Sequence, residues 1–222
     1  MKIYETKVEA GTKQWLKIPV DEECSLKAAA FCGSRPGKRL IVTAGVHGCE
    51  YIGILAVSRL IQELDPRQMK GEVVFLPIAN EGGFYKEIKQ LVPEDGVNLN
   101  RAFPGTEMGS RSAKIAAAVE TYLYPDADFL VDLHSGDIHE MVVPFAFFPV
   151  AAGETVEKKA AAAARAMSLS WRVASTAKNG LYSWAAQKGI PALLLERGGL
   201  GRWTGIRPPV NSRGRSRRHS VS

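Results

Sequence analysis

The sequence predicts an α/β fold, with a mixed, largely parallel central sheet flanked by helices. Short apolar runs alternate along the chain with segments of helical apolar spacing. Several of these runs end directly at polar or charged groups, as they do where strands deliver functional side chains to a sheet edge. Strands that alternate with helices build parallel or mixed sheets, so this class follows from the pattern.

The first half of the chain is expected to start with strands and then to alternate. Residues 1–20 are expected to form a hairpin or strand pair, and residues 26–31 a further strand before a turn at Pro36-Gly37. The elements predicted next are a strand at 40–43, an amphipathic helix at 51–64, a strand at 73–78 and a long loop from 80 to 109.

The second half repeats the alternation. We expect helices at 110–122, 154–167 and 181–188, and strands at 129–133, 141–150, 171–175 and 192–195. The strand at 141–150 contains Pro144, which removes a ladder hydrogen bond and predicts a break. The helix at 154–167 contains five consecutive alanines, the strongest helix formers.

Two motifs carry chemistry. His47 and Glu50 stand three residues apart directly after the apolar run at 40–42, and His134 follows a second apolar run at 129–131. Two histidines and one carboxylate are the ligand set of a catalytic zinc site that keeps one position open for water. The pattern indicates a zinc hydrolase, whereas each histidine taken alone would be read as a structural residue.

The run GVNLNRAFPG at 96–105 and Glu196 at the end of an apolar run add to these motifs. With them, the chain resembles the succinylglutamate desuccinylase/aspartoacylase family, a deacylase branch of the zinc carboxypeptidase superfamily. The likeness extends from about Leu40 to Trp203, in the order HxxE, NR, H, E.

This resemblance implies that His47, Glu50 and His134 hold one zinc ion per chain. It implies that Asn100 and Arg101 bind a carboxylate of the substrate, and that Glu196 is the general base. The expected activity is hydrolysis of an amide bond in a small N-acyl amino acid or a related compound that carries a free carboxylate, with ester cleavage as a possible extension.

Residue chemistry supports the same roles. A carboxylate beside an activated water accepts its proton and returns it to the departing amine. Arg101 offers a planar fork that grips a carboxylate through two parallel hydrogen bonds. Asp132 lies two residues before His134, on the same strand face, where its carboxylate can orient the imidazole. The alternatives are a Glu196–Arg197 salt bridge and a solvated loop arginine at position 101.

One part of the family pattern is missing. Relatives usually carry an arginine before the NR pair, where it polarises the scissile carbonyl, but residues 83–97 contain only Lys86 and Lys89 as cations. A lysine can donate one charge-assisted hydrogen bond with less geometric control. Either a lysine substitutes, another arginine reaches the site, or activity is poor.

Composition is ordinary for a globular protein. The chain has 222 residues, with 45% hydrophobic and 23% charged residues. The longest apolar stretches are far too short to span a membrane, and residues 1–7 form no signal core. The three cysteines make neither a zinc motif nor an even disulfide framework, so a cytoplasmic location is expected. The oligomeric state is not indicated.

The net charge of +6 comes mainly from the end of the chain. Five arginines and no acidic residue lie in residues 205–222, and without them 24 basic residues stand against 23 acidic ones. We therefore expect a catalytic domain at 1–204 and a basic, disordered tail at 205–222, with the C-terminal β domain of the relatives absent. A truncated gene and a natural short form are both compatible with this pattern.

Several functions remain open beside the zinc-dependent deacylase. The protein could be a peptide carboxypeptidase, a catalytically silent metal-binding protein or a truncated fragment. A nucleic-acid partner acting through the tail is a weaker expectation, because the body carries almost no net charge. The partner expected is a small molecule, and no membrane partner is expected.

Overall fold

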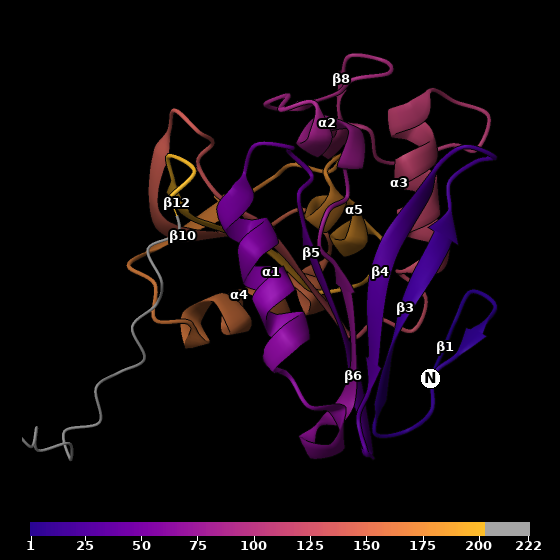
Figure 1. The fold of residues 1–222 in the computed structure, drawn as a ribbon. Coiled ribbons are helices and arrows are strands. Elements are labelled where there is room, and N and C mark those ends of the chain that lie inside the picture. Colours follow the sequence, from indigo (N-terminus) through magenta and orange to yellow (C-terminus); the bar gives the residue numbers. More distant parts are fainter. Residues whose placement is uncertain (203–222) are drawn as a thin grey trace, which may run out of the picture.

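A single eight-stranded sheet runs through the computed structural model, which describes residues 1–202 (Figure 1). Its strands are β3 (Thr12–Pro19), β4 (Ser25–Cys32), β5 (Arg35–Ala44), β6 (Lys70–Leu76), β9 (Phe129–His134), β10 (Met141–Pro149), β11 (Trp171–Ser175) and β12 (Ala192–Gly199). They lie in the order β11-β10-β12-β9-β5-β6-β4-β3. The central pairs β12–β9, β9–β5 and β5–β6 are parallel, as is β10–β11, while the pairs β10–β12, β6–β4 and β4–β3 are antiparallel. The predicted mixed, largely parallel sheet is confirmed.

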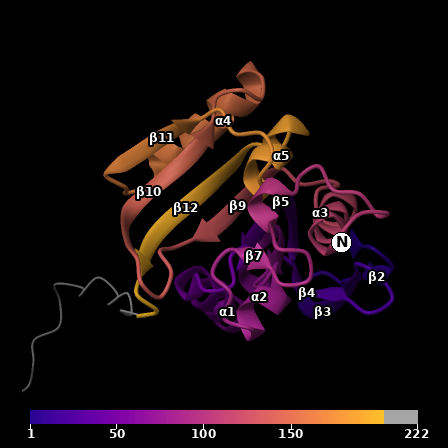
Figure 2. The same cartoon turned by 90° about the horizontal axis from the view of Figure 1, so that it is seen from above.

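Helices cover both faces of this sheet (Figures 1 and 2). Helices α1 (Tyr51–Glu63) and α4 (Glu154–Ala166) pack on one face, whereas α3 (Arg111–Tyr122) and α5 (Leu181–Gln187) pack on the other. Successive side chains of a strand point to opposite faces. Ile41 of β5 accordingly joins the cluster under α3 and α5, and its neighbour Val42 joins the cluster under α1.

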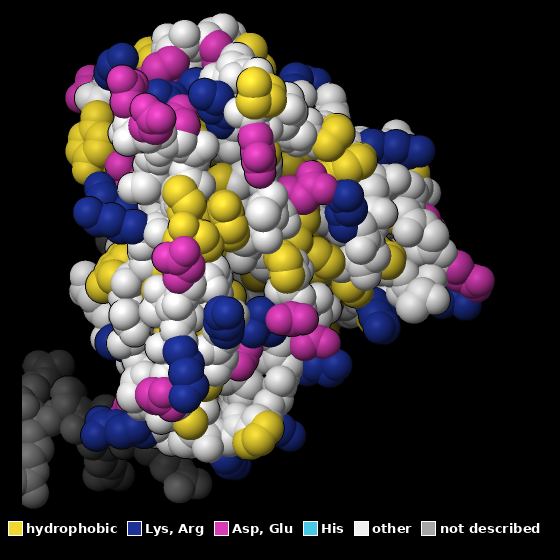
Figure 3. Space-filling view, turned by 90° about the vertical axis from the view of Figure 1, so that its right-hand side faces the viewer, with side chains coloured by type: hydrophobic (Ala, Val, Ile, Leu, Met, Phe, Trp, Pro, Cys, Tyr) yellow, Lys and Arg dark blue, Asp and Glu magenta, His cyan; other side chains and the backbone are white. Residues whose placement is uncertain are grey.

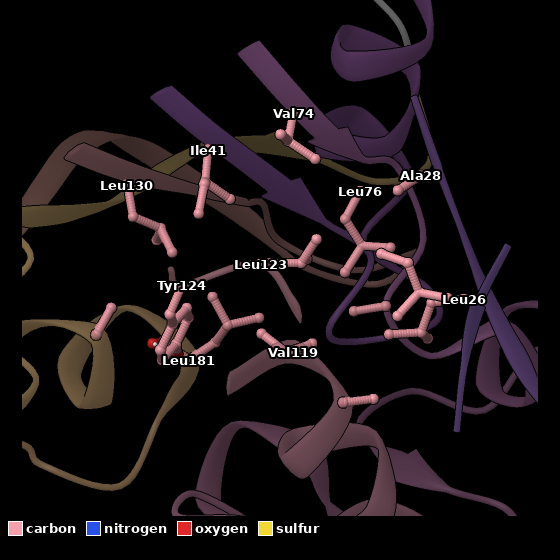
Figure 4. Close-up of a cluster of buried hydrophobic side chains, with 14 of the residues drawn as sticks. Leu26, Ala28, Ile41, Val74, Leu76, Val119, Leu123, Tyr124, Leu130 and Leu181 are labelled. Carbon is pink, nitrogen blue, oxygen red and sulfur yellow. Dashed lines mark hydrogen bonds between the residues drawn. The ribbon is translucent and has the colours of Figure 1, made fainter. Parts of the chain in front are cut away.

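The largest apolar cluster lies between the sheet and the helices α3 and α5 (Figure 4). Strand side chains such as Ile41, Leu76 and Leu130 meet Leu123 and Leu181 there, and all five are fully buried. Burying a leucine or isoleucine side chain stabilises the fold by roughly 1.5–3 kcal/mol. This packing holds the central strands in register, and the register sets where their polar ends meet.

The loop expected at 80–109 contains short elements of its own. These are α2 (Glu81–Tyr85), the two-stranded β7 (Leu91–Val92) and β8 (Val97–Asn98), and the 3₁₀ turn η2 (Leu99–Arg101). Such pieces have too few residues to show a hydrophobic period, so the sequence pattern does not reveal them.

The structure differs from the predictions at two prolines. The residues Pro36-Gly37 lie inside β5 and do not form a turn before it, because a register shift between Arg35 and Arg39 places them at an irregularity in the ladder. Near Pro144 the register of β10 against β12 shifts between Val142 and Phe145, so the strand is irregular there but continues as one element.

The beginning of the chain agrees in part with the expected hairpin. A small hairpin of β1 (Lys2–Ile3) and β2 (Thr6–Lys7) forms, while β3 pairs with β4 instead of with an earlier strand. The 3₁₀ turn η1 (Pro66–Gln68) connects α1 to β6.

The surface of the described residues is mixed in charge on the side shown in Figure 3, where basic and acidic side chains are interspersed. In residues 1–202 no helix is both long and apolar enough to cross a membrane. The tail predicted at 205–222 lies outside the described residues, and so does the end of the domain predicted at 1–204.

Candidate metal centre

Three candidate metal ligands meet where β5 and β9 end. His47 lies in the turn after β5, Glu50 is the residue that precedes the first turn of α1, and His134 is the last residue of β9. Because β5 and β9 are parallel neighbours, their carboxyl ends lie at the same sheet edge. One donor atom from each of the three side chains lies within 4.8 Å of the other two.

The Glu50 carboxylate is the centre of this cluster. Its Oε1 lies 2.6 Å from Nδ1 of His47 and its Oε2 lies 2.8 Å from Nδ1 of His134. The backbone N–H of Ser135 also donates to Oε2, at 3.2 Å. Burial raises the pKa of Glu50, but the two imidazoles outweigh burial and bring this pKa down to about 2. The carboxylate is therefore ionised at every ordinary pH.

The outward nitrogens of both imidazoles are held by oxygen atoms. Nε2 of His134 lies 2.9 Å from Oδ2 of Asp132, whose Oδ1 accepts a hydrogen bond from Thr43 at 2.6 Å. Nε2 of His47 lies 3.1 Å from Oδ1 of Asn98. Partners on the outward nitrogens fix which nitrogen faces inward, so both Nδ1 atoms point at the same space. Burial lowers the pKa of His134, but the carboxylates around it raise it well above its usual value.

The position of Asp132 on its strand predicts a contact with His134, and the structure has this contact. The sequence pattern does not single out Asn98 or Thr43. Asn98 stands inside the run at 96–105, but 51 residues separate it from His47. Thr43 lies opposite Asp132 in the register of β5 against β9, and that pairing is not visible before the strand order is known.

Glu196 lies beside His134 because the two residues are paired in the register of β12 against β9. Its Oε2 is buried and has no hydrogen-bond partner among the described residues. Burial is the main reason that its pKa is raised to about 7, and the charges of Glu50 and Asp132 raise it further against the opposing effect of His134. No ion pair joins Glu196 to Arg197 in the part of the chain that the structure describes.

The position of Glu196 along its strand differs from the prediction. Strand β12 continues to Gly199, because its last residues pair with the beginning of β10, and Glu196 is therefore inside it. The pairing of β12 with β9, however, stops at Glu196 and His134. Glu196 thus lies at the edge of the parallel part of the sheet, although β12 continues beyond it.

Asn100 and Arg101 line a cavity of about 280 Å³ next to the cluster, which His47, Asn98 and Tyr182 also line. The turn η2 directs both residues to it. Oδ1 of Asn100 accepts the backbone N–H of Leu181 at 3.1 Å, so the amide NH₂ remains available to a ligand. The side chain of Arg101 is exposed. The predicted carboxylate-binding residues and the predicted metal ligand His47 thus share one cavity.

Comparisons with known proteins agree with this geometry. The model of the succinylglutamate desuccinylase/aspartoacylase catalytic domain matches residues 36–207. An N-alpha-acetyl-L-2,4-diaminobutyric acid deacetylase of Halomonas elongata is 35% identical over 137 residues, which are 60% of this chain and 40% of that protein. The chain thus spans less than half of this curated relative.

Solved structures extend the comparison to the fold. A succinylglutamate desuccinylase from Silicibacter sp. TM1040 superposes with a TM-score of 0.74 at 28% identity, over 87% of this chain and 61% of that chain. A metallo-carboxypeptidase from Burkholderia cenocepacia superposes with a TM-score of 0.65 at 16% identity, over 85% of this chain and 56% of that chain. The second likeness shows the fold alone, and it agrees with the predicted carboxypeptidase-like architecture.

Proposed function

The chain belongs to the succinylglutamate desuccinylase/aspartoacylase family, and from that premise we propose that it hydrolyses the amide bond of a small N-acyl amino acid with the help of one zinc ion. Deacylation is the activity named for its curated relative, whose substrate is an acetylated diamino acid. Because the chain covers only part of that relative, the acyl group and the amino acid of this chain are left open within the class.

The donor set fits zinc. Two inward-facing imidazole nitrogens and an ionised carboxylate come from His47, His134 and Glu50, which is the set that zinc hydrolases use. Their outward partners, Asn98 and Asp132, keep the imidazoles in this orientation. A zinc ion held here would act as a Lewis acid and lower the pKa of water to about 7.

Glu196 carries the proposal as the proton-transferring residue. Its buried Oε2 has no hydrogen-bond partner within residues 1–202, and its pKa of about 7 suits both uptake and release of a proton near neutral pH. Oε2 takes the proton of the attacking water and delivers it to the amine nitrogen that departs. The position of this carboxyl group beside the His–Glu–His cluster, with its Oε2 unpaired among the residues that the structure describes, is the single observation on which the function most depends.

Substrate binding is assigned to the cavity beside His47. Arg101 would hold a carboxylate of the substrate through its guanidinium fork, and the free amide NH₂ of Asn100 would donate a second hydrogen bond. A volume of about 280 Å³ suits a group of the size of one amino acid.

A substrate panel tests the proposal. The purified chain is incubated with and without added zinc and with N-acetyl, N-succinyl and peptide-linked derivatives of acidic, basic and neutral amino acids. Zinc-dependent release of the free amino acid from at least one N-acyl compound is expected. Stoichiometric zinc binding without any turnover would support the silent metal-binding protein instead, and cleavage restricted to peptides would support a carboxypeptidase.

The cellular setting and the domain division complete the proposal. We infer a cytoplasmic enzyme, since Cys24, Cys32 and Cys49 are all free thiols. The catalytic domain is taken as residues 1–204, followed by the basic segment 205–222.

A further inference from the structure

Asp137 is a buried carboxylate at the edge of the metal centre, three residues beyond His134. Its side chain is 2% exposed. Oδ1 accepts the backbone N–H of His139 at 2.7 Å, and Oδ2 lies 2.5 Å from Nζ of Lys89. Lys89 comes from the segment between α2 and β7, so this ion pair connects two loops that are 48 residues apart.

The segment that carries Asp137 is firmly anchored. The backbone N–H of Gly136 donates to Gly198 at 3.0 Å, and the carbonyl of Asp137 accepts the N–H of Leu200 at 2.7 Å. A Cβ at Gly136 would collide with the carbonyl oxygen of Glu140, so glycine is required for this close approach. The carboxylate therefore offers Lys89 a fixed point of attachment.

The ammonium of Lys89 is fixed by its ion pair and still has N–H donors free for another acceptor. A lysine ammonium has three N–H donors, and the side chain of Lys89 is 55% exposed despite its ion pair. The carboxylate of Asp137 is the main reason that the pKa of Lys89 is raised, and Glu50 is among the other carboxylates that raise it. The ammonium is thus charged at neutral pH, and Asp137 holds it beside the loop that begins after His134.

Lys86, the other cation of the segment between α2 and β7, lies near a different carboxylate. Lys86 Nζ lies 4.0 Å from Glu94 Oε1, a carboxylate of its own loop. Arg101 lines the cavity on the His47 side and is already assigned to the substrate carboxylate. Of the two lysines in residues 86–98, Lys89 is the one paired with a carboxylate of the loop that follows β9.

We propose that Lys89, positioned by Asp137, donates a hydrogen bond to the carbonyl oxygen of the scissile amide as negative charge develops on it. This inference rests on the proposed amide hydrolysis. When water oxygen bonds to the carbonyl carbon, an electron pair moves to the carbonyl oxygen, and the Lys89 ammonium stabilises it without giving up a proton. The pair returns as the C–N bond breaks, and the amine leaves with the proton from Glu196.

The test compares Lys89→Ala with Lys86→Ala, which removes the same charge from the same segment. Loss of one oxyanion donor typically lowers kcat by about 10²–10³-fold. We expect that loss for Lys89→Ala with little change in KM or zinc content, and wild-type kinetics for Lys86→Ala. Lys89→Arg should recover part of kcat, and Asp137→Asn should lower kcat less than Lys89→Ala because the lysine is retained but poorly placed.

A binding measurement separates this inference from the proposed function. N-methylphosphonyl-L-glutamate carries a tetrahedral oxyanion in place of the planar amide, and L-glutamate is the matched ligand without it. By calorimetry on the zinc-loaded protein, Lys89→Ala should weaken binding of the phosphonyl compound by at least 10-fold and leave that of glutamate unchanged.

Equal affinity of wild type and Lys89→Ala for the phosphonyl compound overturns the role of Lys89, whether or not turnover is found. A kcat of Lys89→Ala within two-fold of an active wild type also overturns it and leaves the proposed hydrolysis standing. A zinc-loaded wild type that cleaves none of the N-acyl compounds refutes the proposed function instead.

Discussion

Two carboxyl groups at neighbouring positions of the sheet edge have opposite surroundings. Both oxygens of Glu50 have partners, namely His47, His134 and the N–H of Ser135, and its pKa falls to about 2. Oε2 of Glu196 has none in the described part of the chain, and the pKa of Glu196 rises to about 7. Both side chains are removed from most of the solvent, so burial alone does not explain the difference. Hydrogen-bonding and charged partners set the pKa of a buried carboxyl group. They decide whether it stays ionised and can bind a cation, or exchanges a proton near neutral pH.

The largest effect is expected on zinc content when a proposed ligand beside Glu50 is replaced. His47→Ala and His134→Ala each remove one of three proposed ligands, so most bound zinc should be lost, as measured by elemental analysis of the purified variants. His139→Ala is the matched control, because His139 is exposed and lies on the loop that follows β9. Full zinc occupancy in both ligand variants would refute the assignment.

The Glu196 region should respond in the opposite way. Glu196→Gln keeps the shape but cannot take up a proton, so kcat should fall by about 10²-fold or more while zinc content stays at the wild-type level. Steady-state kinetics and elemental analysis on the same preparation check both parts. An unchanged kcat would exclude Glu196 from proton transfer.

The substrate carboxylate tests whether the cavity beside His47 belongs to the same site. Arg101→Lys retains the charge but loses the fork, so kcat/KM should fall by about 10- to 100-fold. Arg59→Lys, on the exposed face of α1, is the control. Amidated substrates should lose a similar factor in the wild type, and equal turnover of amides and free acids would contradict the clamp.

Changes to the residues that orient His134 should lower zinc affinity, and by less the farther the changed residue lies from the ligand. Asp132→Asn weakens the acceptor for His134 Nε2, and a loss of about 10-fold or more in zinc affinity is expected from such changes. Thr43→Val removes only the hydrogen bond to Asp132 and should have a smaller effect. Competition with a chelator measures both affinities, and a larger loss for Thr43→Val would contradict the order of contacts.

The smallest effect concerns the stability of the metal-free protein. The pKa of Glu196 is about 7 when folded and near 4.5 when unfolded, so the folded state binds the extra proton and stability falls as the pH rises from 4.5 to 7. Glu196→Gln has no such dependence. Its gain in unfolding free energy over wild type should be larger at pH 8 than at pH 4.5, with an upper limit of about 3 kcal/mol. Denaturant melts at both pH values measure it, and a pH-independent difference would mean that the pKa of Glu196 is the same in the folded and unfolded states.

Local patterns in the chain are enough for most of the fold. Apolar spacing predicts α1, α3 and α4 to within two residues, and apolar runs predict the strands that carry His134 and Glu196. Burial of one face of a strand or helix follows from neighbouring residues, which is why these elements can be recognised without the fold. The HxxE spacing also belongs to this local information, since a single turn brings His47 and Glu50 together.

Contacts between segments that are far apart in the sequence depend on the order of the strands in the sheet. No local sequence pattern reveals this order. The pairings of Thr43 with Asp132 and of His134 with Glu196 exist because β9 lies between β5 and β12. The ion pair of Lys89 with Asp137 depends in the same way on how two loops meet above this edge. Composition and spacing therefore identify the chemical groups of the candidate site, whereas long-range packing supplies their partners, and with them the difference in pKa between Glu50 and Glu196.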